Sequence, residues 1–268
     1  MTEIETAPTL LALDFDGVLC NGLMEYFQTA WRVYCQIWSH PEAVLPEGLA
    51  EEFNRLRPVV ETGWEMPVVI QAILSGVSEI EILANWAAIA PQLAKATGLS
   101  PTEIGNQVDH TRDRWIANDL ESWLALHQFY PGVIERLQQI SSLHPVIITT
   151  KEERFVVQLL QQQGIDFPQS QIFGKSLKQP KSQTLRALIQ DLSQQNLSQQ
   201  TEHLRIWFVE DRLKTLQAIT VQPDLSPVRL FLGDWGYNTA SDREAARQDP
   251  RIHLLSLSTF AGEFSLWI

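Results

Sequence analysis

The sequence predicts an α/β protein: a doubly wound, Rossmann-like parallel sheet with an all-helical region inserted into it. Two observations carry this prediction. After residue 129, short apolar runs alternate with segments of helical periodicity, which is typical of parallel strands joined by right-handed helical crossovers. Residues 21–128 instead show many helical periods, several prolines and few β-branched runs. We therefore expect an α/β core formed by residues 1–20 and 129–268, and a helical insertion at residues 21–128.

The first strand is expected at Thr9–Leu13, an apolar run that stops at two carboxylates and a glycine. Such a run favours a fully buried strand, which usually belongs to a parallel sheet. Ligands bind beyond the carboxyl ends of these strands, so Asp14 and Asp16 lie where chemistry is expected. Because the two residues are one position apart on an extended backbone, their side chains point in opposite directions. We therefore expect them to have different roles.

Helix-start signals and apolar stripes indicate several helices in the insertion. Ser100 is a suitable N-cap, because it is followed by a proline and an acidic residue in the first turn, Pro101 and Glu103. A second helix is expected from its apolar stripe, which consists of Leu83, Trp86, Ala87 and Ala90.

Strands and helices are expected to alternate after residue 129. Short apolar runs predict strands at 145–148, 206–209 and 228–232, a weaker strand at 171–174 and an edge strand at 252–255. The helices are expected at 133–140, at 155–160 closed by Gly164, at 185–192, and from the capping signature that begins at Ser241. The glutamine-rich Ser193–Thr201 is expected to be a polar surface loop.

Polar groups follow three of these strands: Asp14 and Asp16, then Thr149, then Glu210 and Asp211. Parallel strands present their carboxyl ends at one edge of a sheet, so these groups are expected to converge. The carboxylates would repel one another without a cation, and oxygen ligands with no His or Cys nearby favour Mg²⁺. A metal ion, a threonine hydroxyl and a lysine are suited to hold a phosphoryl group, and the available lysines are Lys175, Lys178 and Lys181.

The composition of the sequence argues against several classes of binding partner. A net charge of −12 argues against nucleic acid or an anionic membrane surface. No stretch approaches the ~20 apolar residues of a membrane span, and residues 1–8 lack the order of a secretory signal. Cys20 and Cys35 are too few for a disulfide framework or a zinc site. We expect a cytoplasmic protein with a small-molecule partner; the sequence indicates no oligomeric state.

The segment Asp14-Phe15-Asp16-Gly17-Val18-Leu19 resembles the opening motif of the haloacid dehalogenase superfamily. The later polar groups match the other motifs of the superfamily in order and type, and the resemblance covers about 1–20 and 129–260. It implies a Mg²⁺-dependent enzyme that works through an aspartyl-phosphate. Asp14 would be the nucleophile, and Asp16 would protonate the leaving oxygen and then activate water.

The resemblance also implies the remaining roles. Thr149 would hydrogen-bond the phosphoryl group and is preferred to Thr150, because the hydroxyl residue of this motif directly ends the strand. Lys181 is the preferred lysine because a helix is expected to begin there, and Lys178 and Lys175 remain alternatives. Mg²⁺ would bind Asp211 directly with support from Glu210, and the carboxylate of Asp14 and the backbone carbonyl of Asp16 would complete the ligands.

The segment Asp234-Trp235-Gly236-Tyr237-Asn238 resembles a turn of phosphoglycolate-phosphatase-like members. In that subfamily, which includes β-phosphoglucomutase-like proteins, a helical cap is inserted where this chain has residues 21–128. Asn21 stands where relatives often have Asp. A cap closes over the site and selects the substrate. Each candidate for reading the substrate is also explained as a structural or solvated residue; the candidates are Arg57, Trp64 and Arg114, with Glu61, Arg112 and Asp113 beside them.

We expect a Mg²⁺-dependent phosphatase that hydrolyses a small phosphate monoester through an aspartyl-phosphate on Asp14. A phosphomutase of the β-phosphoglucomutase kind shares every core residue and is one alternative. A non-catalytic binding or regulatory protein with the same fold is the other. Dehalogenation is disfavoured because Asp16 is present, whereas that chemistry dispenses with the second Asp. The physiological substrate is not indicated by the sequence.

Overall fold

The computed structural model describes residues 7–38, 44–199 and 204–267. The chain divides into two units, each described by itself: a core unit, Met1–Asn21 with Phe129–Ile268, and a helical unit, Gly22–Gln128. The predicted division of the chain differs from this one by Asn21 alone. The chain passes between the units at two short paired strands, β2 (Cys20–Asn21) and β3 (Gln128–Phe129). None of the helices among the described residues is long and apolar enough to cross a membrane.

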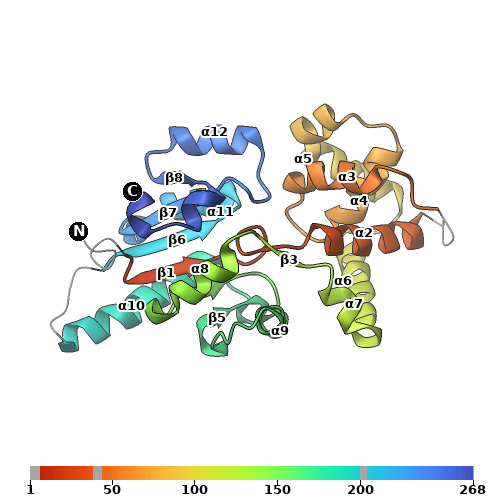
Figure 1. Cartoon of the computed structure of the whole chain (residues 1–268). Helices are drawn as coiled ribbons and strands as arrows, with labels where there is room; N and C mark the ends of the chain where they lie inside the picture. The colour runs from red at the N-terminus through yellow and green to blue at the C-terminus, as the bar shows by residue number, and fades with distance from the viewer. Residues whose placement is uncertain (1–6, 39–43, 200–203, 268) are drawn as a thin grey trace. The chain divides into compact units, whose positions relative to one another are not determined.

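Six parallel strands form the sheet in the described part of the core unit: β1 (Leu10–Leu13), β4 (Val146–Ile148), β5 (Ile172–Phe173), β6 (Ile206–Glu210), β7 (Val228–Gly233) and β8 (Ile252–Leu255). Their order in the sheet is β5-β4-β1-β6-β7-β8. Figure 1 shows β1 in red beside β6 in light blue. The expected doubly wound α/β fold is therefore confirmed, with the last strand at an edge.

Both faces of this sheet are covered. On one face, Ala12 and Phe208 belong to a buried cluster that includes Leu185 of α10 (Lys181–Gln199) and Leu216 of α11 (Leu213–Thr220). On the other face, Trp207 and Phe231 pack on Trp267, with ring centroids 5.5 Å and 5.4 Å apart. The remaining helices of this unit are α8 (Val133–Gln139), α9 (Glu153–Gln162), α12 (Ala240–Gln248) and α13 (Leu257–Phe260).

The register of the central strands determines where the polar residues that follow them lie. Leu13 of β1 is level with Ile147 of β4 and with Val209 of β6. Asp14, the residue after β1, therefore lies beside Glu210 in the register of the two strands. The backbone N–H of Asp14 donates to Val209 O at 2.9 Å. Because all these strands are parallel, the chain leaves each of them at the same edge of the sheet.

Two helix boundaries in the core unit differ from the expectation. Helix α10 continues to Gln199, so the loop expected from Ser193 is wrong for the described part of that segment. Leucine and glutamine are good helix formers, and no Gly or Pro ends the helix there. Helix α12 begins at Ala240 with Thr239 as its N-cap, two residues before the expected start, because Thr239 and Asp242 form a reciprocal capping box.

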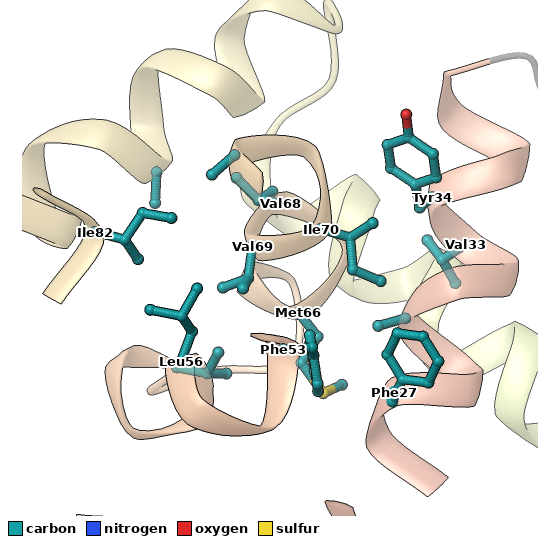
Figure 2. Close-up of a cluster of buried hydrophobic side chains, with 14 of the residues drawn as sticks. Phe27, Val33, Tyr34, Phe53, Leu56, Met66, Val68, Val69, Ile70 and Ile82 are labelled. Atoms are coloured by element: carbon teal, nitrogen blue, oxygen red, sulfur yellow. The ribbon is translucent and has the colours of Figure 1, made fainter. Parts of the chain in front are cut away.

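The helical unit has its own hydrophobic core. Figure 2 shows Phe27, Phe53, Met66, Val69 and Ile82 pointing toward one another, and all of them are at most 3% exposed. They come from α2 (Leu23–Ile37), α3 (Leu49–Leu56), α4 (Glu65–Leu74) and α5 (Glu79–Ala96). The other α-helices in the described part of this unit are α6 (Pro101–Asn118) and α7 (Leu120–Leu124).

The expected start of α6 is confirmed, whereas the expected stripe of α5 is partly wrong. Ser100 and Glu103 form a capping box before Pro101. The buried face of α5 consists of Ile82, Trp86, Ala90 and Ala94, while Leu83 is 42% exposed. Asn85 has non-helical backbone angles, so the helix is kinked between the two turns that the stripe would have joined.

A buried ion pair ties three helices of the helical unit together. Glu25 of α2 is fully buried and accepts hydrogen bonds from Arg112 Nε at 2.7 Å and Nη2 at 3.2 Å. Thr29 Oγ1 donates to the same carboxylate at 2.8 Å, and Trp123 Nε1 donates at 3.1 Å. Such a pair is costly to break, because either partner left alone would be an uncompensated buried charge.

Candidate active site

Three carboxylates converge at the carboxyl edge of the sheet. Asp14 follows β1, Glu210 ends β6, and Asp211 follows it; each is at most 6% exposed. Each offers an oxygen that lies within 4.8 Å of the others. Among the described residues this is a group of carboxylates without His or Cys, and an all-oxygen set of this kind fits Mg²⁺.

Lys181, the first residue of α10, connects two of these carboxylates. Its Nζ lies 2.8 Å from Asp14 Oδ1 and 2.7 Å from Glu210 Oε2. Burial by itself would lower the pKa of Lys181, but the charges of Asp14 and Glu210 outweigh it and keep the pKa above its usual value. Lys175 and Lys178, the alternatives from the sequence, are exposed. The geometry therefore brings Lys181 to the carboxylates.

One ammonium does not balance three buried carboxylates. Burial, and then the charge of Glu210, raise the pKa of Asp14 to about 7. Burial, and then the charge of Asp14, raise the pKa of Asp211 to about 6. The pKa of Glu210 is also raised, mainly by burial. Each shift reports that a negative charge is disfavoured here, so a divalent cation among these oxygens would relieve the excess charge.

Asp16 lies outside this group and pairs with a different lysine. Its two carboxylate oxygens are 3.1 Å and 3.3 Å from Nζ of Lys151. Sequence reasoning assigned no role to Lys151, although it follows Thr149 and Thr150 directly after β4. The signal that could have identified it was its place among the polar residues at the carboxyl end of that strand.

Thr149 is 5% exposed, whereas Thr150 is exposed. The backbone N–H of Lys151 donates to Thr149 Oγ1 at 3.1 Å, and the backbone N–H of Thr149 donates to Phe173 O at 2.9 Å. The hydroxyl is therefore held in place by the turn that follows β4.

The overall architecture resembles solved structures of one fold. None of the family models and none of the curated protein sequences that were searched matches the chain. A Bacteroides fragilis protein assigned as a haloacid dehalogenase-like hydrolase aligns with a TM-score of 0.54 and 16% identity, over 94% of this chain and 98% of its own. The chain has the haloacid dehalogenase fold.

Other proteins share the haloacid dehalogenase fold with this chain. A Lactobacillus delbrueckii protein assigned as a phosphoglycolate phosphatase aligns with a TM-score of 0.56 and 13% identity, over 92% of this chain and 93% of its own. Mycobacterium tuberculosis Protein Tyrosine Kinase A aligns with a TM-score of 0.52 and 16% identity, over 98% and 99%. Proteins of different reported activity share the fold, so the reaction has to be argued from the residues of the site.

Two glycines of the core unit allow close approach to Asp211. A Cβ at Gly17, whose φ is +86°, would lie 2.1 Å from Asp211 Oδ2. A Cβ at Gly236 would lie 2.2 Å from the Cβ of Asp211 and 2.6 Å from Gly17 O. The turn after β7 therefore packs directly on this carboxylate, and only glycine fits at the two contact points.

The candidate substrate readers belong to the helical unit, where the structure gives most of them internal partners. Arg57 Nη1 donates to Val60 O at 3.0 Å, and Arg57 Cζ lies over the ring of Tyr26, 4.7 Å from its centroid. Trp64 packs against the hydrophobic core of the unit, and Arg114 is exposed. Arg112 is held by Glu25. Their proposed contact with substrate stays a prediction.

Proposed function

We propose that the protein is a Mg²⁺-dependent phosphatase that hydrolyses a small phosphate monoester through an aspartyl-phosphate on Asp14. The observation that carries the proposal is the arrangement of Lys181, which bridges Asp14 and Glu210 beside Asp211 at the carboxyl edge of the sheet. A nucleophile, a cation that can hold phosphoryl oxygens and a metal-ligand set are thus adjacent. This combination supports phosphoryl transfer.

Asp14 and Asp16 divide the chemistry between them. A carboxylate oxygen of Asp14 attacks phosphorus, and the bond from phosphorus to the ester oxygen breaks as Asp16 donates a proton to that oxygen. Asp16 then takes a proton from water, whose oxygen attacks phosphorus and displaces Asp14. Inorganic phosphate leaves and both carboxyl groups return to their starting states. Their separate locations in the site support separate roles.

The other residues hold the phosphoryl group and the cation. Mg²⁺, when bound, would neutralise negative charge on the phosphoryl oxygens; Asp14, Asp211 and the backbone carbonyl of Asp16 would hold it. Glu210 supports Asp211, because its Oε1 accepts from the backbone N–H of Asp211 at 3.2 Å. Thr149 Oγ1 already accepts from a backbone N–H, so its own hydrogen is suited to donate to a phosphoryl oxygen.

Release of inorganic phosphate tests the proposal. Wild type and Asp14→Asn are assayed with Mg²⁺ or EDTA on sugar phosphates, nucleotides, an aryl phosphate and phosphoglycolate, the last because one structural relative is assigned as its phosphatase. We expect release that needs Mg²⁺ and disappears in the variant. Folded wild type that releases no phosphate and forms no fluoroberyllate adduct on Asp14 would refute the proposal. Isomerised sugar phosphate without release would identify a mutase instead.

A further inference from the structure

Asn238 ties together the ends of the two strands that flank Asp211. It is 7% exposed, and its Nδ2 donates to Asp211 O at 3.0 Å and to Gly233 O at 2.8 Å. Gly233 is the last residue of β7, and Asp211 follows the last residue of β6. One side-chain amide thus satisfies two backbone carbonyls at the point where both strands leave the sheet.

Arg243 of α12 holds Asn238 in turn. Its Nη1 donates to Asn238 Oδ1 at 2.9 Å and to Asn238 O at 3.1 Å. The amide orientation is therefore determined: Oδ1 faces the guanidinium, and Nδ2 faces the two carbonyls. The polar chain runs from Arg243 through Asn238 to the backbone of Asp211.

The position of Asp211 depends on the turn that follows β7, because Asp211 lies beyond the last paired residues of β6 and β7. The pairing between β6 and β7 ends with Glu210 and Leu232. Two contacts of the Asp211 side chain come from the same turn: the backbone N–H of Tyr237 donates to Oδ2 at 2.7 Å, and Gly236 packs on its Cβ. A shift of this turn would therefore move the carboxylate.

We propose that Asn238 is a positioning residue that sets the affinity of the site for its divalent cation by fixing Asp211. The inference rests on the proposed function, in which Asp211 is a metal ligand. Groups that orient metal ligands change metal affinity by about 10- to 100-fold when removed. Asn238 acts through backbone position, because its donor reaches the carbonyl of Asp211 and not the carboxylate.

Binding of Mn²⁺ to the full-length protein tests the inference without any substrate. Electron paramagnetic resonance measures free Mn²⁺ in titrations of wild type and Asn238→Ala, and competition with Mg²⁺ gives the Mg²⁺ affinity. We expect Asn238→Ala to bind Mn²⁺ about 10- to 100-fold more weakly, the range typical of lost supporting contacts. Arg243→Met, which leaves Asn238 in place, is expected to weaken binding by a smaller factor.

Arg251→Ala is the matched control. Arg251 Nη2 also donates to two backbone carbonyls, Leu225 O at 3.0 Å and Val228 O at 3.3 Å. These carbonyls lie at the opposite end of β7 from Asp211. Asn238→Ala and Arg251→Ala each remove one side-chain donor from two backbone carbonyls, but only Asn238→Ala is expected to change Mn²⁺ affinity. Circular dichroism and thermal unfolding in EDTA confirm that the variants compared are folded.

Three results would overturn the inference. The first is a folded Asn238→Ala protein with wild-type Mn²⁺ affinity, and the second is equal weakening by Arg251→Ala. If Asn238→Ala does not fold, wild-type affinity in Arg243→Met is the third. Wild type that binds neither Mn²⁺ nor Mg²⁺ would instead refute the proposed function, and the role of Asn238 with it, so the two failures are distinguishable.

Discussion

Burial of Asp14 is expected to make the metal-free core unit less stable as the pH rises. The pKa of Asp14 is about 7, against an ordinary value of 3.8. Between these values the folded chain binds a proton that the unfolded chain lacks, so stability is lost as the pH rises through this window. The slope is about 1.4 kcal/mol per pH unit well below the folded pKa and half of that at the pKa, so a rise from about pH 5.5 to about pH 7 removes about 1.6 kcal/mol.

Asp14→Asn isolates this effect, because the amide has nearly the same shape and does not titrate. Asp211, with a pKa of about 6, titrates in both proteins, and loss of the Asp14 charge lowers its pKa in the variant, which adds to the difference in the same direction. Native-state hydrogen exchange of peptides from β1 and β6, measured in EDTA across this pH range, reports the core unit alone. We expect the free energy of opening of wild type to fall by at least about 1.6 kcal/mol relative to that of the variant.

Magnesium provides the control for this experiment. Added Mg²⁺ is expected to remove the pH-dependent loss in wild type, because a bound cation favours the ionised carboxylate. Parallel pH profiles of wild type and Asp14→Asn in EDTA would refute the reasoning, since another group would then carry the pH dependence.

Three substitutions test other parts of the structure. Lys181→Met is expected to lower phosphatase kcat by at least about 100-fold, as loss of one charge-stabilising donor does; a smaller loss would contradict its contact with the phosphoryl group. Gly236→Ala is expected to destabilise the metal-free protein by about 1–3 kcal/mol in urea unfolding, because its Cβ would overlap Asp211. Arg112→Met is expected to cost about 3–5 kcal/mol by leaving Glu25 buried and unpaired. The double variant Glu25→Leu/Arg112→Met should recover most of that loss, and a double variant as unstable as the single one would show that packing, not charge, is responsible.

The convergence of the central polar residues followed from strand pattern alone. Apolar runs that stop at Asp14, Thr149 and Glu210 are sufficient, because the parallel strands of one sheet end at a common edge. This inference needs only which residues end a strand and in which direction the strand runs. The preference for Lys181 over Lys175 and Lys178 rested on the resemblance and on the helix expected to begin there, and α10 does begin at Lys181.

The supporting contacts did not follow from the sequence, for a different physical reason. Asn238 donates to backbone carbonyls, which every residue has. No pattern of side chains in the sequence therefore indicates its partners. Lys151 is long and flexible, and only the folded turn decides that it reaches Asp16. The stripe predicted for α5 included Leu83, which is exposed, and two residues later Asn85 has non-helical backbone angles. The local geometry of the folded chain determines such contacts, and the hydrophobic pattern of the sequence does not specify that geometry.

The central position of β1 has a consequence for the order of folding. Its two neighbours, β4 and β6, follow only after the whole helical unit, and Leu13 pairs with Val209. The helical unit is one continuous segment with its own hydrophobic core, so it can fold as soon as it has been synthesised. The strand that carries Asp14 must wait for most of the chain, and long-range pairing of this kind is slow. During synthesis, Asp14 is thus among the first residues made and among the last to reach its partners.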